Sequence, residues 1–207
     1  MALPKPTRPV RIVLATGNRD KIQEMEHALE GLPLSLLTRD DFPALPEVVE
    51  DGETLDENAL KKARVLCVAT GIAALADDTG LEVDALGGAP GVFSSRFAGP
   101  GATYADNVYL LLERMKGVPR ERRTARFRCV IALVEPGGMD VLVEGICEGE
   151  IIEEARGEGG FGYDPVFYVP RRGQTFAQLS LSEKDKISHR GQAMARMRRL
   201  LEERFLL

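Results

Sequence analysis

The 207-residue sequence contains no long uninterrupted apolar stretch. No window approaches the roughly 20 apolar residues that cross a bilayer, and residues 1–9 lack the apolar run of a signal peptide. Low-complexity tracts and internal repeats are also missing. We therefore expect no membrane association and a cytoplasmic protein, whose residues 1–207 fit either one large domain or two lobes that share a sheet.

Cysteine is scarce and carries no pairing pattern. The three cysteines, Cys67, Cys129 and Cys147, lie among apolar neighbours and form no C-x-x-C pair. This distribution predicts buried thiols in a reducing compartment, in agreement with a cytoplasmic location.

An excess of basic residues is also absent. The chain has 27 Lys and Arg against 32 Asp and Glu, a formal net charge of −5. Proteins that bind duplex nucleic acid normally present a basic face, so we expect no nucleic-acid partner. A nucleotide site is not excluded, because it needs only a few local cations.

What the sequence does contain is an alternation of short apolar runs and helical stripes. Strands are expected over residues 10–15, 34–38, 72–76, 123–134, 141–152 and 165–169. Helices are expected from after residue 21 to about 30, and over about 54–70, 104–116 and 189–205, with a short one near 182–185. The acidic, proline-containing segment 39–52 is expected to be a loop.

Two adjacent carboxylates follow the apolar run 72–76. Asp77 and Asp78 come directly after it, and Thr79 and Gly80 follow them. Acids at the end of a buried strand are costly unless a cation holds them. Carboxylate oxygens are preferred ligands of Mg²⁺, so we expect a Mg²⁺ site here.

A second pattern is typical of phosphate binding. The segment Thr16-Gly17-Asn18-Arg19-Asp20-Lys21 joins a strand to a helix, where free backbone N–H groups and the helix dipole favour anions. No G-K-[ST] of a Walker loop is present, and a plain strand–turn–helix connection is the alternative. Lys62 lies seven residues after Leu55, on or beside a buried helical stripe. Its amine either snorkels to solvent or points at a phosphate.

Residues 157–162 match G-x-G-x-x-G, but a strand rather than a helix is expected after them. We therefore reject a dinucleotide fingerprint. The glycines can let the backbone approach a flat ligand, and Phe161 and Tyr163 can supply stacking area. His189 and Arg190 open the last helix, where a cation opposes the dipole, so another use is expected for them.

Six blocks together resemble the inosine triphosphate pyrophosphatase family, which removes dITP, ITP and XTP. They are residues 15–21, 57–63, 76–81, 86–91, 159–165 and 183–190, in the family's order and spacing over nearly the whole chain. The resemblance implies an α/β fold with a long bent mixed β-sheet and flanking helices, forming two lobes around a central cleft. It also implies a homodimer, Mg²⁺ dependence, purine nucleoside triphosphate substrates, and a monophosphate and pyrophosphate as products.

The resemblance further implies roles for individual residues. Asp78 matches the proton acceptor and a metal ligand, and Glu50 the second metal-binding acid, with Asp51, Glu53 and Glu57 as close competitors. The matching substrate-binding positions are Thr16, Gly17, Asn18, Arg19, Asp20 and Lys21 on the phosphate side, then Lys62 and Thr79, and Phe161, Gly162, Tyr163, Asp164, Lys184, His189 and Arg190 on the base and sugar side. Asp77 is expected to give structural support, and Arg96 is a further candidate contact.

Two other functions are open at this point. A Maf-type pyrophosphatase for pyrimidine or modified nucleotides would share the acids and the architecture, but residues 161–164 and 188–190 argue against it. A non-catalytic nucleotide sensor would have no use for a hydrolytic centre at Asp77, Asp78 and Lys62.

Overall fold

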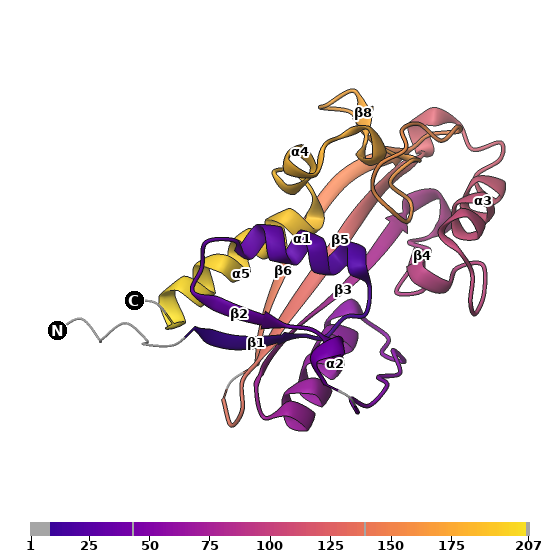
Figure 1. Ribbon diagram of the computed structural model, residues 1–207. Coiled ribbons are helices and arrows are strands. Elements are labelled where there is room, and N and C mark those ends of the chain that lie inside the picture. The colour runs from indigo at the N-terminus through magenta and orange to yellow at the C-terminus, as the bar shows by residue number, and fades with distance from the viewer. Residues whose placement is uncertain (1–8, 43, 139, 206–207) are drawn as a thin grey trace. The chain divides into compact units, whose positions relative to one another are not determined.

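The computed structural model describes residues 9–42, 44–138 and 140–205 (Figure 1). Its strands are β1 (Val10–Leu14), β2 (Leu34–Leu37), β3 (Ala73–Val83), β4 (Pro90–Gly91), β5 (Thr124–Val134), β6 (Asp140–Ile151), β7 (Phe167–Val169) and β8 (Gln174–Thr175). Its α-helices are α1 (Arg19–Leu29), α2 (Leu55–Thr70), α3 (Tyr104–Arg114), α4 (Leu181–Asp185) and α5 (His189–Phe205). The predicted α/β class is confirmed.

The strands form a mixed sheet with the hydrogen-bonded order β2-β1-β3-β5-β6-β7-β8, and β4 pairs with β3. β1 runs parallel to both β2 and β3. The pairs β3–β4, β6–β7 and β7–β8 are antiparallel. The mixed sheet with flanking helices therefore agrees with the prediction, whereas the central cleft stays a prediction.

The chain divides into two compact units. Unit 1 comprises residues 1–78, 129–145 and 190–207. Its described part holds β1, β2, α1, α2 and α5, with α1 and α5 on one face of the strands and α2 on the other (Figure 1). Alternation along the strands explains this layering: Ile12, Leu14 and Leu75 pack with residues of α1 and α5 in one core cluster.

Unit 2 comprises residues 79–128 and 146–189. Its core gathers Leu81 and Val83 of β3, Leu111 of α3 and Phe127 of β5 with aromatic side chains of the 163–176 segment. Phe127, Phe167 and Phe176 contact one another with ring centroids 4.6–5.9 Å apart. Each aromatic ring buries a large area, so these three contribute much of the unit 2 core.

Helix ends follow the side-chain chemistry of the sequence. The hydroxyl of Thr54 accepts from the backbone of Glu57 at the start of α2, and Gly71 ends that helix with a φ of 66°. The Glu57 side chain accepts from the backbone N–H of Glu53, the residue before Thr54, at 2.7 Å.

One boundary prediction is wrong. The apolar run 72–76 was expected to end as a strand before Asp77, but β3 continues to Val83 and carries both acids in its interior. The strand that ends here is β1, whose paired register stops at Leu14 opposite Leu75. Cations from the helices hold the acids, so their burial does not terminate the strand.

No helix among the described residues is both long enough and apolar enough to cross a membrane. The three cysteines are buried free thiols, as the sequence predicted.

Candidate active site

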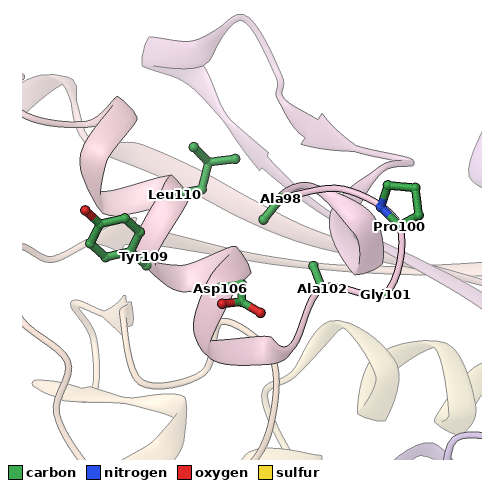
Figure 2. A pocket seen from close by; sticks show the side chains of 7 residues that line it. All are labelled: Ala98, Pro100, Gly101, Ala102, Asp106, Tyr109 and Leu110. Atoms are coloured by element: carbon green, nitrogen blue, oxygen red, sulfur yellow. The ribbon is translucent and has the colours of Figure 1, made fainter.

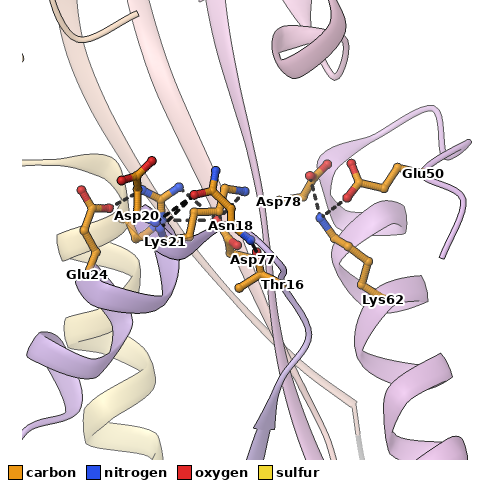
Figure 3. Close-up of polar contacts among 10 residues, drawn as sticks. Thr16, Asn18, Asp20, Lys21, Glu24, Glu50, Lys62, Asp77 and Asp78 are labelled. Carbon is orange, nitrogen blue, oxygen red and sulfur yellow. Dashed lines mark hydrogen bonds and ion pairs between the residues drawn. The ribbon is translucent and has the colours of Figure 1, made fainter. Parts of the chain in front are cut away.

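Asp77 and Asp78 point to opposite faces of β3, since successive side chains in a strand alternate. Asp77 lies on the side of α1 and α5, where it contacts Lys21 and Arg190. Asp78 lies on the side of α2, where it contacts Lys62. Two adjacent acids therefore occupy separate environments, and Figure 3 shows the two groups of polar contacts.

Asp77 is the centre of a buried ion-pair network. Its carboxylate is fully buried and lies 3.0 Å from the amine of Lys21 and 3.1 Å from the guanidinium of Arg190. Arg190 also donates to Glu24, which is buried as well. Burial opposes ionisation of Asp77, but Lys21 and Arg190 outweigh it and hold the pKa of this carboxyl below its ordinary value.

Asp78 forms a different group with Lys62 and Glu50. The Lys62 amine lies 2.9 Å from Oδ1 of Asp78 and 2.9 Å from Oε1 of Glu50. Burial raises the pKa of Asp78 above its ordinary value, against the opposing effect of Lys62. The pKa of Lys62 is also raised, because the nearby carboxylates overcome the effect of its burial.

The second oxygen of Asp78 decides what this group can do. Oδ2 is buried, and no described residue donates a hydrogen bond to it. A buried carboxylate oxygen without a donor is costly, which makes it available to a cation or to a water. The contacts also favour Glu50 over its competitors, since Asp51 pairs with Lys61 and Glu57 binds the backbone of Glu53.

The residues present fit a Mg²⁺ ion. Glu50 and Asp78 offer hard carboxylate oxygens that already converge on one cation, the amine of Lys62. No group of three or more His, Cys, Asp or Glu side chains suited to a metal occurs in the described part of the chain. Mg²⁺ commonly takes one or two protein carboxylates and completes its shell with water and substrate phosphates, so two acids suffice.

The phosphate-side loop satisfies more of its own donors than expected. The Asn18 side chain accepts from the backbone N–H groups of Asp20 and Lys21, at 2.9 and 3.4 Å. The backbone N–H of Asn18 in turn donates to the Thr16 hydroxyl at 3.2 Å. Asn18 is therefore the N-cap of α1, and the helix starts at Arg19, earlier than predicted. Anion binding here would rest on Lys21 and the helix dipole more than on free N–H groups.

Gly17 and Thr79 hold positions that a substrate could approach. A Cβ added at Gly17 would meet nothing within 4 Å. Thr79 is half-buried in the interior of β3, next to Asp78.

The predicted base-side residues Phe161, Asp164 and Lys184 form a compact group in unit 2. The Lys184 amine lies 2.7 Å from the Asp164 carboxylate, and both side chains are buried. The same amine lies 4.7 Å from the centroid of the Phe161 ring. Asp164 also accepts the backbone N–H of Phe161 at 2.9 Å, so this carboxylate positions both neighbours.

Tyr163 and His189 use their rings for packing. The Tyr163 ring belongs to the unit 2 core, and its hydroxyl donates to the Ser94 carbonyl at 2.9 Å. The His189 ring stacks on Phe127, with centroids 4.6 Å apart. The stacking area expected from Tyr163 is therefore taken up by the core, and the expected base contacts of both residues stay predictions.

Arg190 occupies a place that the sequence did not indicate. It was predicted as a base contact, but its guanidinium donates to Asp77 and Glu24 of unit 1. These carboxylates explain why a cation at the first turn of α5 is tolerated against the dipole. Its base contact stays a prediction.

Packing within the protein and backbone conformation explain the glycines of the 157–162 segment. A Cβ at Gly157 would lie 2.6 Å from the Ala177 backbone, and one at Gly160 would lie 2.1 Å from the Asp164 carboxylate. Gly162 has open space and a φ of 61°. Packing explains Gly157 and Gly160, and the positive φ explains Gly162, so none of these three glycines requires a flat ligand close to the backbone.

Glu24 was missed by the sequence reasoning. It lies three residues after Lys21 on the same face of α1. That spacing was the available signal, but it could not show that Arg190 would supply the partner charge.

A pocket of 470 Å³ lies elsewhere in unit 2. It is lined by Ala98, Pro100, Gly101, Ala102, Asp106, Tyr109 and Leu110, and Figure 2 shows these side chains around the start of α3. None of the predicted site residues lines it, so this pocket is not the candidate site. Arg96, another candidate contact, lies with its guanidinium 5.2 Å from the Phe93 ring.

Comparison with known proteins settles the family. The Ham1 family is matched over residues 12–200. The chain belongs to the Ham1 family. A protein of Geobacter sulfurreducens named dITP/XTP pyrophosphatase is 52% identical over 185 residues, 89% of this chain and 93% of that protein. A second dITP/XTP pyrophosphatase, from Desulforamulus reducens, is 49% identical over 197 residues, 95% of this chain and 98% of that protein.

Solved structures of Ham1 proteins share the fold. The HAM1 protein of Coxiella burnetii is similar with a TM-score of 0.86 and 45% identity, covering 94% of this chain and 99% of that one. The Ham1 protein of Staphylococcus aureus has a TM-score of 0.84 and 36% identity, covering 93% and 98%. The family resemblance indicated by the six sequence blocks is thereby confirmed.

Proposed function

We propose that this protein is a nucleoside-triphosphate pyrophosphohydrolase for non-standard purine nucleotides. Its substrates are dITP, XTP and ITP, and its products are the nucleoside monophosphate and pyrophosphate. The observation that carries this proposal is the buried Asp78 carboxylate, with one oxygen on Lys62 and the other without a donor. The names of the Ham1 relatives support the substrate class.

Asp78 is the residue to which we assign the proton transfer. A pKa raised by burial makes a carboxylate a better base than it is in water. Its oxygen without a donor would orient the attacking water and accept its proton as the water adds to the α-phosphorus. Pyrophosphate leaves on the opposite side.

The lysines and the second acid support this step. Lys62 and Lys21 would donate to phosphate oxygens and stabilise the charge that develops there. Asp77 holds Lys21 in place through their 3.0 Å contact. Glu50 and Asp78 would hold a Mg²⁺ ion, which supplies charge neutralisation between the carboxylates and the phosphates.

Base recognition is assigned to the group around Lys184. Asp164 holds the Lys184 amine, which is an N–H donor. A donor from this group aimed at the 6-oxygen of hypoxanthine or xanthine would be left unpaired by adenine, which carries an amine there. Such a loss can discriminate by roughly 10⁴-fold. Phe161 would stack on the base.

Product analysis tests where the bond breaks. With dITP and Mg²⁺, we expect dIMP and pyrophosphate in equal amounts, separated by ion exchange and by ³¹P NMR. Release of inorganic phosphate and dIDP would contradict the proposed attack at the α-phosphorus. Tight dITP binding without any product would instead favour a nucleotide sensor.

A cytoplasmic location and a homodimer complete the proposal. The family resemblance implies the homodimer, and the cytoplasmic location follows from the sequence and is consistent with the buried free thiols. Cell fractionation tests the location.

A further inference from the structure

Lys62 occupies the position where the two predicted metal ligands converge. Its amine makes two contacts of 2.9 Å, one with Glu50 and one with Asp78. The Lys62 side chain is buried, and its amine donates to both acids. Figure 3 shows the amine at the end of a side chain that rises from α2 towards both acids.

The Lys62 ammonium faces two carboxylates, Glu50 and Asp78, and no described residue donates a hydrogen bond to Oδ2 of Asp78. A Mg²⁺ ion that joined Lys62 there would place two cations against the same oxygens. Like charges a few ångströms apart repel strongly in a site with restricted access to water. A triphosphate would add enough negative charge to hold both cations.

We propose that Lys62 is an internal counter-ion that competes with Mg²⁺ for Glu50 and Asp78 in the nucleotide-free protein. The metal then binds tightly only together with a triphosphate, whose oxygens draw the Lys62 amine away from the acids. A lysine suits this exchange, because its ammonium is a point charge on a flexible stem with three donors. This inference rests on the proposed function for the identity of the anion, but its test uses no nucleotide.

Metal titration of the nucleotide-free protein tests the competition. Mn²⁺ serves as the probe for Mg²⁺, and free Mn²⁺ is measured by electron paramagnetic resonance at about pH 8, where exposed carboxylates are ionised. Lys62→Met removes the ammonium and keeps an unbranched side chain. We expect this variant to bind Mn²⁺ about tenfold or more tightly than the wild type.

Lys61→Met is the matched control, since Lys61 is the adjacent residue and pairs with Asp51 instead. Its Mn²⁺ affinity should equal that of the wild type. Adding Asp78→Asn to Lys62→Met should abolish the gain, which locates the ion on Asp78. A wild-type protein that binds Mn²⁺ as tightly as Lys62→Met would overturn the proposal.

Thermal unfolding gives a second measurement that keeps the test decisive. Lys62→Met removes the ammonium that pairs with Glu50 and Asp78, so this variant should have a lower melting temperature than the wild type. Mn²⁺ should raise the melting temperature of Lys62→Met more than that of the wild type or of Lys61→Met. If Lys62→Met does not fold, Lys62→Gln replaces it with a neutral donor. Equal Mn²⁺ stabilisation of wild type and variant refutes the competition, even where pyrophosphate release from dITP is normal.

Discussion

At the scale of single residues, the alternation of side chains along β3 separates the two acids of the site. Asp77 and Asp78 are neighbours in sequence, yet one contacts Lys21 and Arg190 and the other contacts Lys62. Asp77 has its pKa lowered by its partners, whereas Asp78 has its pKa raised by burial. An acid with a lowered pKa is suited to holding cations in place, and an acid with a raised pKa is suited to accepting a proton.

Asp78→Asn should therefore lose turnover and keep the fold. We expect a decrease in kcat of about 10²- to 10⁴-fold for dITP, because a positioned base contributes that much, while circular dichroism stays unchanged. Asp140→Asn is the matched control, since Asp140 pairs with Arg64 outside the site, and its kcat should be that of the wild type. A folded Asp78→Asn protein with wild-type turnover would remove Asp78 from the mechanism.

Asp77→Asn should act on stability, with a defined pH dependence. The variant leaves Lys21 and Arg190 without their shared anion, and breaking a buried ion pair costs about 3–5 kcal/mol. The pKa of Asp77 is lowered in the folded state from an ordinary value of 3.8. Its contribution is therefore complete above that value and is lost as the pH falls towards the folded pKa.

Urea unfolding of wild type and Asp77→Asn at several pH values measures this effect. The difference in unfolding free energy should be largest near neutral pH and should narrow below about pH 4. Equal stability of the two proteins at neutral pH would show that Asp77 does not hold the network together.

At the scale of elements, the 157–164 segment is shaped by its own packing. Gly160 and Gly162 share a positive φ, at 71° and 61°, but only Gly160 would place a Cβ against Asp164. Because the two glycines have similar φ values, comparing their alanine variants separates the cost of a positive φ from the cost of a steric clash.

Gly160→Ala should be clearly more destabilising than Gly162→Ala. The positive φ alone costs about 1–2 kcal/mol, which is the expected loss for Gly162→Ala. Gly160→Ala adds the displacement of Asp164 from Lys184, a buried pair, and should lose roughly 3 kcal/mol or more. Thermal unfolding of both variants measures the difference, and equal melting temperatures would argue against a packing role for Gly160.

The spacing of apolar residues and the capping residues predicted most helices and strands, because these signals lie within the element itself. Thr54 and Gly71 bound α2 through their own side-chain and backbone preferences, so this helix was predicted almost to the residue. The end of β3 was not predicted correctly. Asp77 and Asp78 are tolerated in the interior of this strand because α1, α2 and α5 supply cations that pair with them. Such long-range partners leave no mark in the local sequence.

In the candidate site too, the features carried by local sequence were predicted, and the contacts between distant residues were not. Lys62 was predicted on a buried stripe, and the structure gives its two partners. Glu24 and the observed place of Arg190 could not be predicted, because they are 166 residues apart and meet only in the fold.

At the scale of the whole molecule, two separate cores underlie the two units. One gathers β1, α1 and α5 around Leu14 and Met194, and the other gathers aromatic side chains around Phe127. The sequence predicted two lobes from the family resemblance, since periodicity alone does not assign strands to different cores.

The homodimer is a prediction at this scale. Static light scattering should give a mass twice that of the 22.7 kDa chain. A mass equal to one chain at micromolar concentration would refute it without affecting the assignment of Asp78.

The central claim is that this chain hydrolyses non-standard purine triphosphates, and a comparison of kcat/KM tests it most directly. Pyrophosphate release with Mg²⁺ would be measured for dITP, XTP, dATP, dGTP, dTTP and UTP. We predict that kcat/KM for dITP and XTP exceeds that for dATP by about 10²-fold or more, up to the roughly 10⁴-fold that an unpaired donor can impose. Equal values for dITP and dATP, or higher values for dTTP and UTP, would contradict it.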